Sequence, residues 1–214
     1  MYLSICFHLK STGILNAYMW KRTIDIISGI CGCLFFLISF PIIGFAIVYE
    51  SGFPILVRLN RVSSGKIIKV YKFRSMVKNA HEIKPRLQHL NERKDGPLFK
   101  IKNDPRLTHV GRLLRKFRLD EVPQFINVLK GDMSLVGPRP HEIEEIAAYP
   151  EPYKHIAYHK AGLTGLSQVN GASALPFQKE LEYDKQYIEL ASFKTDAKII
   201  GKTIKIFFSD PTGV

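Results

Sequence analysis

Cysteine is scarce in this chain, and it follows no metal-binding pattern. Only three cysteines occur in 214 residues, and two of them, Cys31 and Cys33, lie inside an apolar stretch. The histidines are too scattered to complete a zinc site, so we expect a reduced, cytoplasm-facing protein rather than a disulfide-stapled secreted one. The sequence also lacks internal repeats, low-complexity tracts and a glycine-rich nucleotide loop, which argues against repeat proteins and the common nucleotide-binding motifs.

Acidic residues are in deficit. Lysine and arginine number 31 against 19 aspartates and glutamates, which gives a formal net charge of +12 and an isoelectric point near 9.6. Such an excess of positive charge favours an anionic partner, whether nucleic acid, a lipid surface or a phosphorylated substrate.

Charged residues are missing altogether from Ile26 to Tyr49. As a straight helix this stretch would span ~36 Å, which exceeds the ~30 Å hydrocarbon core of a bilayer. The sequence therefore predicts a membrane segment. Its length, and the lack of a small-residue cleavage site after it, argue against a secretory signal peptide.

Two topologies are open for this membrane segment. Pro41 is expected to kink the helix, and Ser39 is expected to bond to the backbone carbonyl that the proline leaves free. A re-entrant helix, which enters and leaves on one side, would keep the basic residues at both ends in the cytoplasm, as the positive-inside rule requires. An ordinary kinked transmembrane helix is the alternative. The flanking basic residues are Lys21, Arg22, Arg58, Arg61, Lys66 and Lys69.

The membrane segment divides the chain into three parts. Residues 1–20 form an N-terminal extension that is too short to span a membrane; it is either interfacial or lies upstream of an alternative start at Met19. Residues 21–50 form the membrane helix. Residues 51–214 form one domain, for which we expect an α/β fold.

The first part of the domain is predicted to be a β-hairpin. Residues 54–59 and 66–74 have strand character, and residues 60–65 supply the turn. Residues 78–104 are polar and are expected to be irregular.

Amphipathic spacing predicts helices farther along the chain. One covers residues 107–117, and the next begins at Asp120 and closes at Lys130-Gly131. Two more cover residues 177–190 and 193–208. The last has an apolar face opposite a row of lysines, which is typical of a helix in a membrane interface; a surface helix packed on the domain core is the alternative.

Asp120 and Glu121 are the strongest candidates for chemistry, because basic residues surround them in the sequence. If they open a helix, the helix dipole lowers the pKa of the Asp120 carboxyl and keeps it ionised. An ionised carboxylate can attack phosphorus to form an acyl phosphate, or it can bind Mg²⁺, which prefers oxygen ligands. A plain helix cap is the alternative.

Lys72 lies in the second predicted strand, and Arg115 and Arg139 are candidate anion-binding cations, since Arg115 lies five residues before Asp120 and Arg139 lies in a rigid turn. Cations at such a site would neutralise a diphosphate as charge moves to the leaving group. Each also has a purely structural interpretation, as an exposed strand lysine, a solvated helix face and a rigid turn between prolines, respectively.

Longer motifs carry a resemblance to a known family. They are Val70-Tyr-Lys-Phe-Arg-Ser-Met76, Asn103-Asp-Pro-Arg-Leu-Thr-His-Val-Gly-Arg112, the block from Leu119 to Pro140, Gly162-Leu-Thr-Gly165 and Gln168-Val-Asn-Gly171. In this order they resemble the bacterial sugar transferase family, the small monotopic phosphoglycosyl transferases that act on polyprenyl phosphate. The resemblance runs from about Trp20 to about Phe207.

The resemblance implies an enzyme. A UDP-sugar gives its sugar-1-phosphate to the enzyme's aspartate and UMP leaves; polyprenyl (undecaprenyl) phosphate then takes the phospho-sugar, which initiates a surface glycan such as an exopolysaccharide, lipopolysaccharide or capsule. The family's nucleophile, which also meets Mg²⁺, matches Asp120, and its neighbouring acid, expected to assist as a base, matches Glu121. Its phosphate-contacting cations match Lys72, Arg115 and Arg139.

The resemblance also implies a location. Family members sit in the bacterial inner (plasma) membrane through a re-entrant helix, with lipid as a partner and the active site at the cytoplasmic face. We expect no nucleic-acid partner. Whether the protein forms a homo-oligomer is left open by the sequence. The rival interpretations are an inactive membrane scaffold of the same fold and a membrane-tethered basic nucleic-acid binder.

This chain departs from the family pattern at several points. The serine and proline of the helix break are separated by a residue in Ser39-Phe-Pro41, and the usual Pro-Gly-Ile-Thr-Gly-Trp segment is Ala161-Gly-Leu-Thr-Gly-Leu166. Ala172 stands where arginine is common, and Arg118 where serine is often found. Some of these changes fall in a loop expected near the donor, so the sequence does not predict which sugar is transferred.

Overall fold

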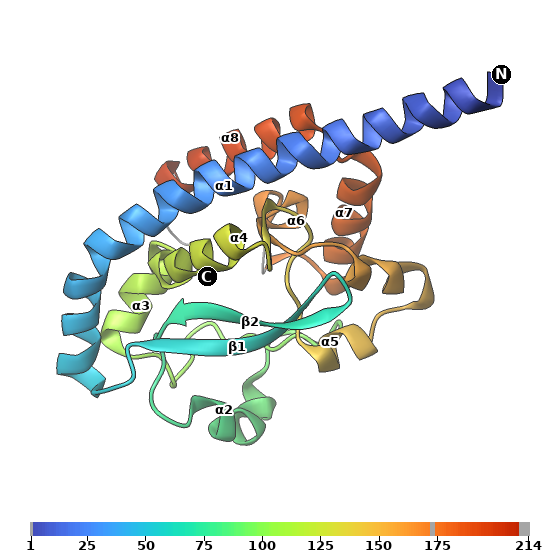
Figure 1. Ribbon diagram of the computed structural model, residues 1–214. Coiled ribbons are helices and arrows are strands. Elements are labelled where there is room, and N and C mark those ends of the chain that lie inside the picture. The colour runs from blue at the N-terminus through green and yellow to red at the C-terminus, as the bar shows by residue number, and fades with distance from the viewer. Residues whose placement is uncertain (1, 172–173, 210–214) are drawn as a thin grey trace.

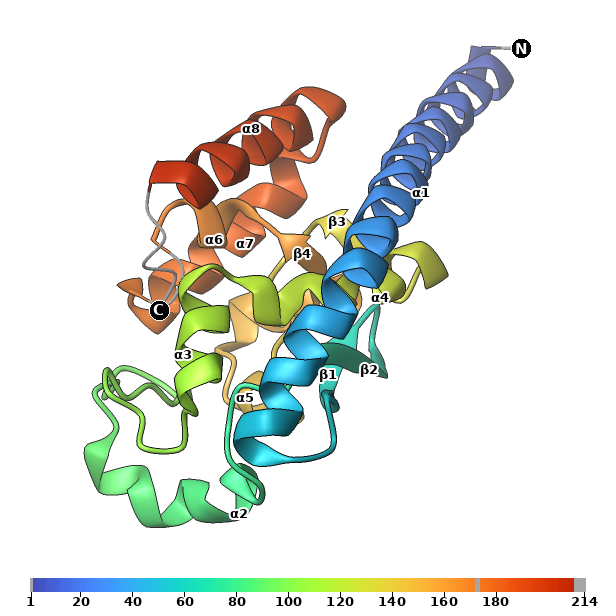
Figure 2. The same ribbon diagram turned by 90° about the vertical axis from the view of Figure 1, so that its left-hand side faces the viewer.

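The fold is mixed α/β, as predicted. The structure is a computed structural model that describes the backbone of residues 2–171 and 174–209, with side chains from Met19 onward. A long N-terminal helix and the last helix lie on one side of the molecule, and the β-hairpin lies below them (Figures 1 and 2). The short helices between residues 80 and 90 lie on the opposite side from the two long ones.

The elements follow one another in a mixed order along the chain. The strands are β1 (Leu56–Ser63), β2 (Lys66–Phe73), β3 (Ser134–Val136) and β4 (Gly162–Thr164). The α-helices are α1 (Tyr2–Ser51), α2 (Ala80–Ile83), α3 (His109–Lys116), α4 (Phe125–Lys130), α5 (Ile143–Ala147), α6 (Leu166–Val169), α7 (Phe177–Leu190) and α8 (Phe193–Ser209). The 3₁₀ helices are η1 (Lys84–Leu90), η2 (Leu119–Gln124) and η3 (Glu151–Tyr158).

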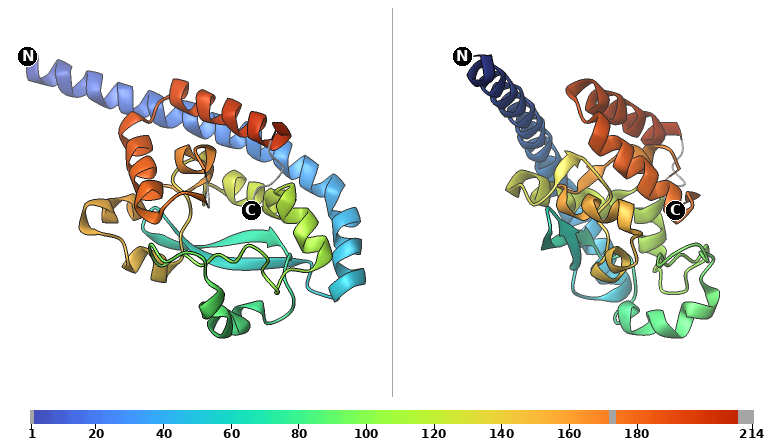
Figure 3. Two further views of the ribbon diagram at one scale, coloured as in Figure 1. Left: turned by 180° about the vertical axis from the view of Figure 1, so that it is seen from behind. Right: turned by 90° about the vertical axis from the view of Figure 1, so that its right-hand side faces the viewer.

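Helix α1 continues across the predicted boundary at residue 20 and bends toward the hairpin in its last part (Figures 1 and 3). Pro41 lies inside it and accounts for a bend, because proline removes a backbone donor. The role predicted for Ser39 is wrong. Its hydroxyl donates to the Phe36 carbonyl at 3.1 Å, not to the Leu37 carbonyl that Pro41 leaves free. A serine in a helix bonds three or four residues back, and Leu37 is too near in the chain.

The apolar part of α1 has one buried side and one uncovered side. The segment Met19–Ser51 is long and apolar enough to cross a membrane, and its most apolar 18-residue stretch has a mean hydropathy of 2.5. Phe36 and Ile47 enter a core cluster with Phe73 of β2 and with residues of α3 and η2. Large apolar side chains elsewhere on the helix are exposed; they include Ile30, Leu34, Leu37, Ile38, Ile42 and Phe45.

Strands β1 and β2 form the predicted hairpin, but the predicted turn at residues 60–65 is too long. The antiparallel pairing runs without interruption up to Ser63 opposite Lys66. Ser64 and Gly65 alone make the turn, and both have positive φ angles, 51° and 69°. A two-residue turn of this kind matches the right-handed twist of the strands, so it extends the pairing.

The helices near the hairpin agree with the sequence in part. Thr108 caps α3 by accepting a hydrogen bond from the Gly111 N–H at 2.9 Å. Gly131, with a φ of 87°, ends α4 as predicted. The segment from Leu119 to Gln124 is a 3₁₀ helix rather than the start of the predicted α-helix. Helices α7 and α8 lie where the amphipathic pattern predicts them.

Strands β3 and β4 were not predicted from the sequence. They pair in parallel, with Ser134 opposite Gly162. A Cβ atom on Gly162 would lie 2.1 Å from the Gly137 nitrogen, so no other residue fits there. The close approach fixes the start of the turn from Gly137 to Pro140 beside the rest of the domain.

Candidate active site

The residues predicted to form the site come from separate elements that meet beside β2. Lys72 lies near the end of β2, Arg115 in the last turn of α3, Asp120 and Glu121 in η2, and Arg139 in the turn after β3. The Lys72 ammonium joins the acid pair directly. Its Nζ lies 2.6 Å from Glu121 Oε1 and 3.7 Å from Asp120 Oδ2.

The chain reversal before η2 orients the acid pair. Arg118 adopts a left-handed conformation with a φ of 53°, which turns the chain sharply between α3 and η2. Val122 is buried in the core cluster and anchors the far side of the turn. As a result Asp120 is 6% exposed, whereas the Glu121 side chain keeps 37% of its surface.

The pKa of Asp120 shifts in the direction opposite to that expected from the sequence. Burial raises the pKa of the carboxyl and the neighbouring Glu121 adds to the rise, while Lys72 and Arg115 oppose it without reversing it. The expected helix-dipole effect is weak because η2 is a short 3₁₀ turn. Desolvation of a charge in a low-dielectric site is the larger effect.

Glu121 shifts the other way. Burial opposes its ionisation, but the charge and hydrogen bond of the Lys72 ammonium, together with nearby arginines, outweigh burial, and the pKa is lowered. Arg139 and Arg118 contribute in the same direction. The adjacent acids therefore have different roles available, since Glu121 holds the lysine while Asp120 stays weakly paired.

The two arginines act on the acid pair through space. Arg115 Nε donates to the Ser75 hydroxyl at 3.1 Å, and its charge reaches Asp120. Arg139 donates its backbone N–H to Asp184 Oδ2 at 3.1 Å, and its charge reaches Glu121. All the sequence-predicted residues are thus brought together, although neither arginine contacts the acids directly.

The oxygen atoms of Asp120 suit a magnesium ion that is shared with a substrate. No group of three or more histidine, cysteine or acidic side chains that could hold a metal occurs between Met19 and Ser209, apart from the undescribed residues 172–173. Mg²⁺ commonly binds through one or two carboxylates together with substrate phosphates and water. The donor set fits an ion of that kind, and it does not fit a closed protein cage.

Several residues near the site were missed by sequence reasoning. Ser75 orients Arg115, and Glu180 and Asp184 of α7 contact Arg139. Both acids are almost fully buried, although their segment reads as an ordinary charged helix. Only their spacing of four on one helix face was a usable signal.

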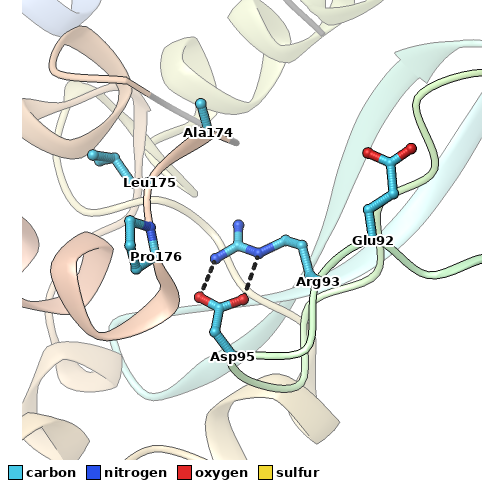
Figure 4. Close-up of a pocket in the computed structure, with 6 residues that line it drawn as sticks. All are labelled: Glu92, Arg93, Asp95, Ala174, Leu175 and Pro176. Carbon is cyan, nitrogen blue, oxygen red and sulfur yellow. Dashed lines mark hydrogen bonds and ion pairs between the residues drawn. The ribbon is translucent and has the colours of Figure 1, made fainter.

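A pocket lies between the loop before α3 and the start of α7. It has a volume of about 250 Å³ and is lined by Glu92, Arg93, Asp95, Ala174, Leu175 and Pro176 (Figure 4). Arg93 forms two 3.3 Å contacts with Asp95, and it also lies 3.7 Å from Glu180. The Glu180 carboxylate therefore lies between Arg139 and Arg93, which lines the pocket.

Known proteins are similar to this sequence over most of its length. Residues 16–210 match the family model described as bacterial sugar transferase. The chain is 40% identical over 194 residues to the galactosyl transferase CpsE of Streptococcus agalactiae serotype III (strain NEM316), covering 87% of this chain and 41% of that protein. It is 39% identical over 195 residues to the undecaprenyl-phosphate galactose phosphotransferase of Salmonella typhimurium (strain LT2), covering 87% of this chain and 40% of that protein.

A shorter relative is matched over most of both chains. The exopolysaccharide production protein ExoY of Rhizobium meliloti (strain 1021) is 32% identical over 190 residues, which cover 87% of this chain and 84% of that protein. By contrast, the chain spans about two fifths of the length of the first two relatives. The family model covers far more than half of the sequence, and the chain belongs to the bacterial sugar transferase family.

Proposed function

We propose that this protein transfers a sugar-1-phosphate from a UDP-sugar to polyprenyl phosphate, with Asp120 as the covalent nucleophile. The observation that carries the proposal is the buried, weakly paired Asp120 carboxylate beside Lys72. The names of the relatives support it, because they include an undecaprenyl-phosphate galactose phosphotransferase and a UDP-galactose-lipid carrier transferase.

Donor binding rests on the cations. The diphosphate of a UDP-sugar carries negative charge, and we propose that Lys72 of β2, Arg115 of α3 and Arg139 of the turn after β3 neutralise it. Arginine suits phosphate because its planar fork donates two parallel hydrogen bonds. We propose that these residues hold the diphosphate with its sugar-bearing phosphorus beside Asp120.

In the first step an Asp120 oxygen attacks that phosphorus. A P–O bond forms to the carboxylate, and the bond from the phosphorus to the UMP oxygen breaks. UMP leaves with the electron pair, and the cations stabilise the charge that collects on it. The product is a sugar phosphate linked to Asp120.

In the second step a phosphate oxygen of the polyprenyl phosphate attacks the same phosphorus. The Asp120 carboxylate leaves with its electron pair, which regenerates the enzyme and forms a polyprenyl-diphosphate sugar. Glu121, kept ionised by Lys72, accepts the proton of any singly protonated acceptor.

We propose Mg²⁺ as the cofactor, held by Asp120 together with the donor's phosphate oxygens. Such an ion supplies additional positive charge against the diphosphate. The protein's own contribution is to keep Asp120 beside the phosphorus and to limit water access by burying it.

We propose that α1 is a re-entrant membrane helix and that the site lies at the cytoplasmic face of the bacterial inner membrane. Both ends of the apolar segment contact the same folded domain. Near its start, Asp25 accepts a hydrogen bond from the Leu135 N–H at 2.7 Å, and at its end the Ser51 hydroxyl accepts one from Arg74 Nη2 at 2.6 Å. A straight span would separate these ends by the bilayer thickness, which disfavours it.

The apolar surfaces support the same arrangement. Ile204, Phe207 and Phe208 of α8 are exposed. Helix α8 itself lies on the side of the molecule that carries α1 (Figure 2). Lys194 and Lys198 add positive charge on α8 that suits anionic lipid headgroups. We propose that α8 lies in the interface, which would hold the site where a lipid-linked phosphate can reach it.

The proposal is tested by UMP release from a panel of UDP-sugars, with the protein in detergent, Mg²⁺ and undecaprenyl phosphate. We expect one donor to give acceptor-dependent release, and incubation with that labelled donor alone to leave label on the protein. The donor that reacts also identifies the sugar. A folded, lipid-bound protein that releases UMP from none of the donors would overturn the transferase and favour an inactive scaffold of the same fold.

A further inference from the structure

Glu180 of α7 is a buried acid at the centre of a cluster of basic groups. Glu180 is 1% exposed. Oε1 lies 3.4 Å from His141 Nε2 and 3.5 Å from Arg139 Nε, and Oε2 lies 3.7 Å from Arg93 Nη1. Burial opposes ionisation of Glu180, but the nearby His141 ring and the charges of Arg139 and Arg93 outweigh it, and its pKa is lowered. Burying a charged carboxylate is unfavourable unless paired charges and hydrogen bonds compensate for the lost hydration.

Pairing with Arg93 does not by itself account for the buried charge of Glu180. Asp95 already pairs with the Arg93 guanidinium through two contacts of 3.3 Å (Figure 4). The charge of Glu180 is therefore available to His141 and Arg139, and Arg139 is the one whose own charge reaches Glu121 of the candidate active site.

Arg139 is held at one end and open at the other. Its backbone N–H donates to Asp184, one turn farther along α7 than Glu180, and its Nε faces Glu180. The Arg139 side chain is 41% exposed, and no hydrogen bond from its Nη groups is found between Met19 and Ser209 outside the undescribed residues 172–173. Because Glu180 occupies the Nε side, the two Nη groups remain for another anion.

The open end of Arg139 lies within electrostatic reach of Glu121. Pro138 and Pro140 restrict the backbone of Arg139, but they leave the torsions of its long side chain free. A buried carboxylate that engages Nε removes much of that freedom before a ligand binds, and pre-organisation of this kind increases affinity.

We propose that Glu180 is a positioning residue for the donor: it holds Arg139 by Nε so that both Nη groups face the diphosphate of the UDP-sugar. This inference rests on the proposed function, in which Arg139 binds that diphosphate. It adds a residue on α7, remote in sequence from the acid pair, to the machinery that binds the donor.

The test compares Glu180→Asp and Glu180→Gln with Glu182→Gln. Glu182 lies on the same helix, and its partner is Lys179, an exposed lysine 2.8 Å away. We expect both Glu180 variants to raise the KM for the UDP-sugar about tenfold, with kcat within about threefold, because an interaction with bound donor is lost in ground and transition state alike. Glu182→Gln should keep both constants. Glu180→Asp retains the buried charge, so it remains informative if Glu180→Gln does not fold.

A double-mutant cycle distinguishes positioning from a general structural role. In an Arg139→Gln background, Glu180→Asp should leave the donor KM unchanged, because the residue it positions is gone. Independent, multiplicative effects of the two substitutions would overturn the inference, as would a wild-type KM in Glu180→Asp. A wild type that transfers no sugar at all would instead count against the proposed function, so the two failures are distinguishable.

Discussion

Two aspartates of this protein are almost equally buried, and they are held in opposite ways. Asp25 of α1 is 3% exposed and Asp120 of η2 is 6% exposed. The Asp25 carboxylate accepts from the Ser134 hydroxyl at 2.8 and 3.0 Å and from the Leu135 N–H at 2.7 Å. The Asp120 carboxylate accepts no side-chain hydrogen bond from the part of the chain whose side chains are described, and its nearest ammonium, on Lys72, lies closer to Glu121.

The surroundings of the two acids differ in the same sense. Beside Asp25, Lys21 donates to the Val136 carbonyl at 2.9 Å, and to Tyr187 and Asp196 at 2.8 Å each. Arg22 donates to the Val128 and Leu129 carbonyls at the end of α4. In this α1 latch, formed by Lys21, Arg22 and Asp25, each charged side chain makes two or more hydrogen bonds to the rest of the domain. A carboxylate satisfied in this way stabilises the fold, whereas one left with few donors keeps its lone pairs available for reaction.

The largest expected effect comes from Asp120→Asn. Loss of the nucleophile should reduce sugar transfer by about 10³-fold or more and abolish labelling of the protein by donor. Stability should be unchanged or higher. Burial disfavours the charged form of Asp120, which is why its pKa is raised, and the asparagine carries no charge to bury. Transfer assays and thermal unfolding on one preparation check both halves. Retained labelling in Asp120→Asn would show that the reacting carboxylate lies elsewhere.

Lys72→Gln should have the next largest effect, because it removes the ammonium that faces both acids. We expect a fall in transfer rate of about 10²-fold. Lys69→Gln on the same strand is the matched control, since the Lys69 side chain is exposed and should leave the rate within about twofold.

The pH dependence of Lys72→Gln sharpens this comparison. The folded pKa of Asp120 lies above its ordinary value of 3.8, so wild-type transfer should fail as pH falls through that raised pKa. Lys72 lowers the pKa of Asp120, so its removal should move the acid limb of the rate profile to higher pH. The sign for stability is opposite: the contribution of protonated Asp120 is present at low pH and is lost as pH rises through the folded pKa. An acid limb that stays in place would mean that another group sets it.

The sequence predicted which residues lie near one another better than it predicted the electrostatics of Asp120. The charges of Lys72, Arg115 and Arg139 all reach the acid pair, Asp120 and Glu121, and the catalytic roles of these residues stay predictions. The direction of the Asp120 pKa shift was wrong, since it depends on burial by distant elements and on the length of η2. Neither quantity can be read from the dipeptide itself.

The fold was predictable where the patterns were long. Helices α7 and α8 and the hairpin follow from amphipathic spacing and strand alternation over many residues. Strands β3 and β4 were missed because each has three residues, too few to show a period, and they pair across a long crossover. The Asp25–Ser134 contact depends on that pairing, so the α1 latch could not be predicted either.

Asp25→Asn should have the opposite effect to Asp120→Asn: it should lower the stability of the fold and leave the rate of sugar transfer nearly unchanged. The amide cannot accept all the hydrogen bonds that the carboxylate accepts, and a buried donor is left unpaired, at a cost of about 2 kcal/mol. We expect a lower thermal unfolding midpoint in detergent and, for the protein that stays folded, a kcat within about threefold of wild type. Glu189→Gln, on the exposed part of α7, is the control and should leave the midpoint unchanged. An unaltered midpoint in Asp25→Asn would contradict the structural role assigned to the α1 latch.

The smallest expected effect is at the other end of the membrane helix. Glu50 accepts from the His109 N–H at 2.6 Å and from the Val110 N–H at 2.8 Å, so the end of α1 caps the start of α3, the helix that carries Arg115. Glu50→Gln keeps one oxygen acceptor but loses the second and the charge that favours a helix N-terminus, which should cost about 1 kcal/mol or less. Faster amide hydrogen exchange in the first turn of α3, with little change in the exchange of β2, would show that the cap is local. Faster exchange in both would mean that the end of α1 supports the active site as a unit, as the α1 latch supports the opposite side of the domain.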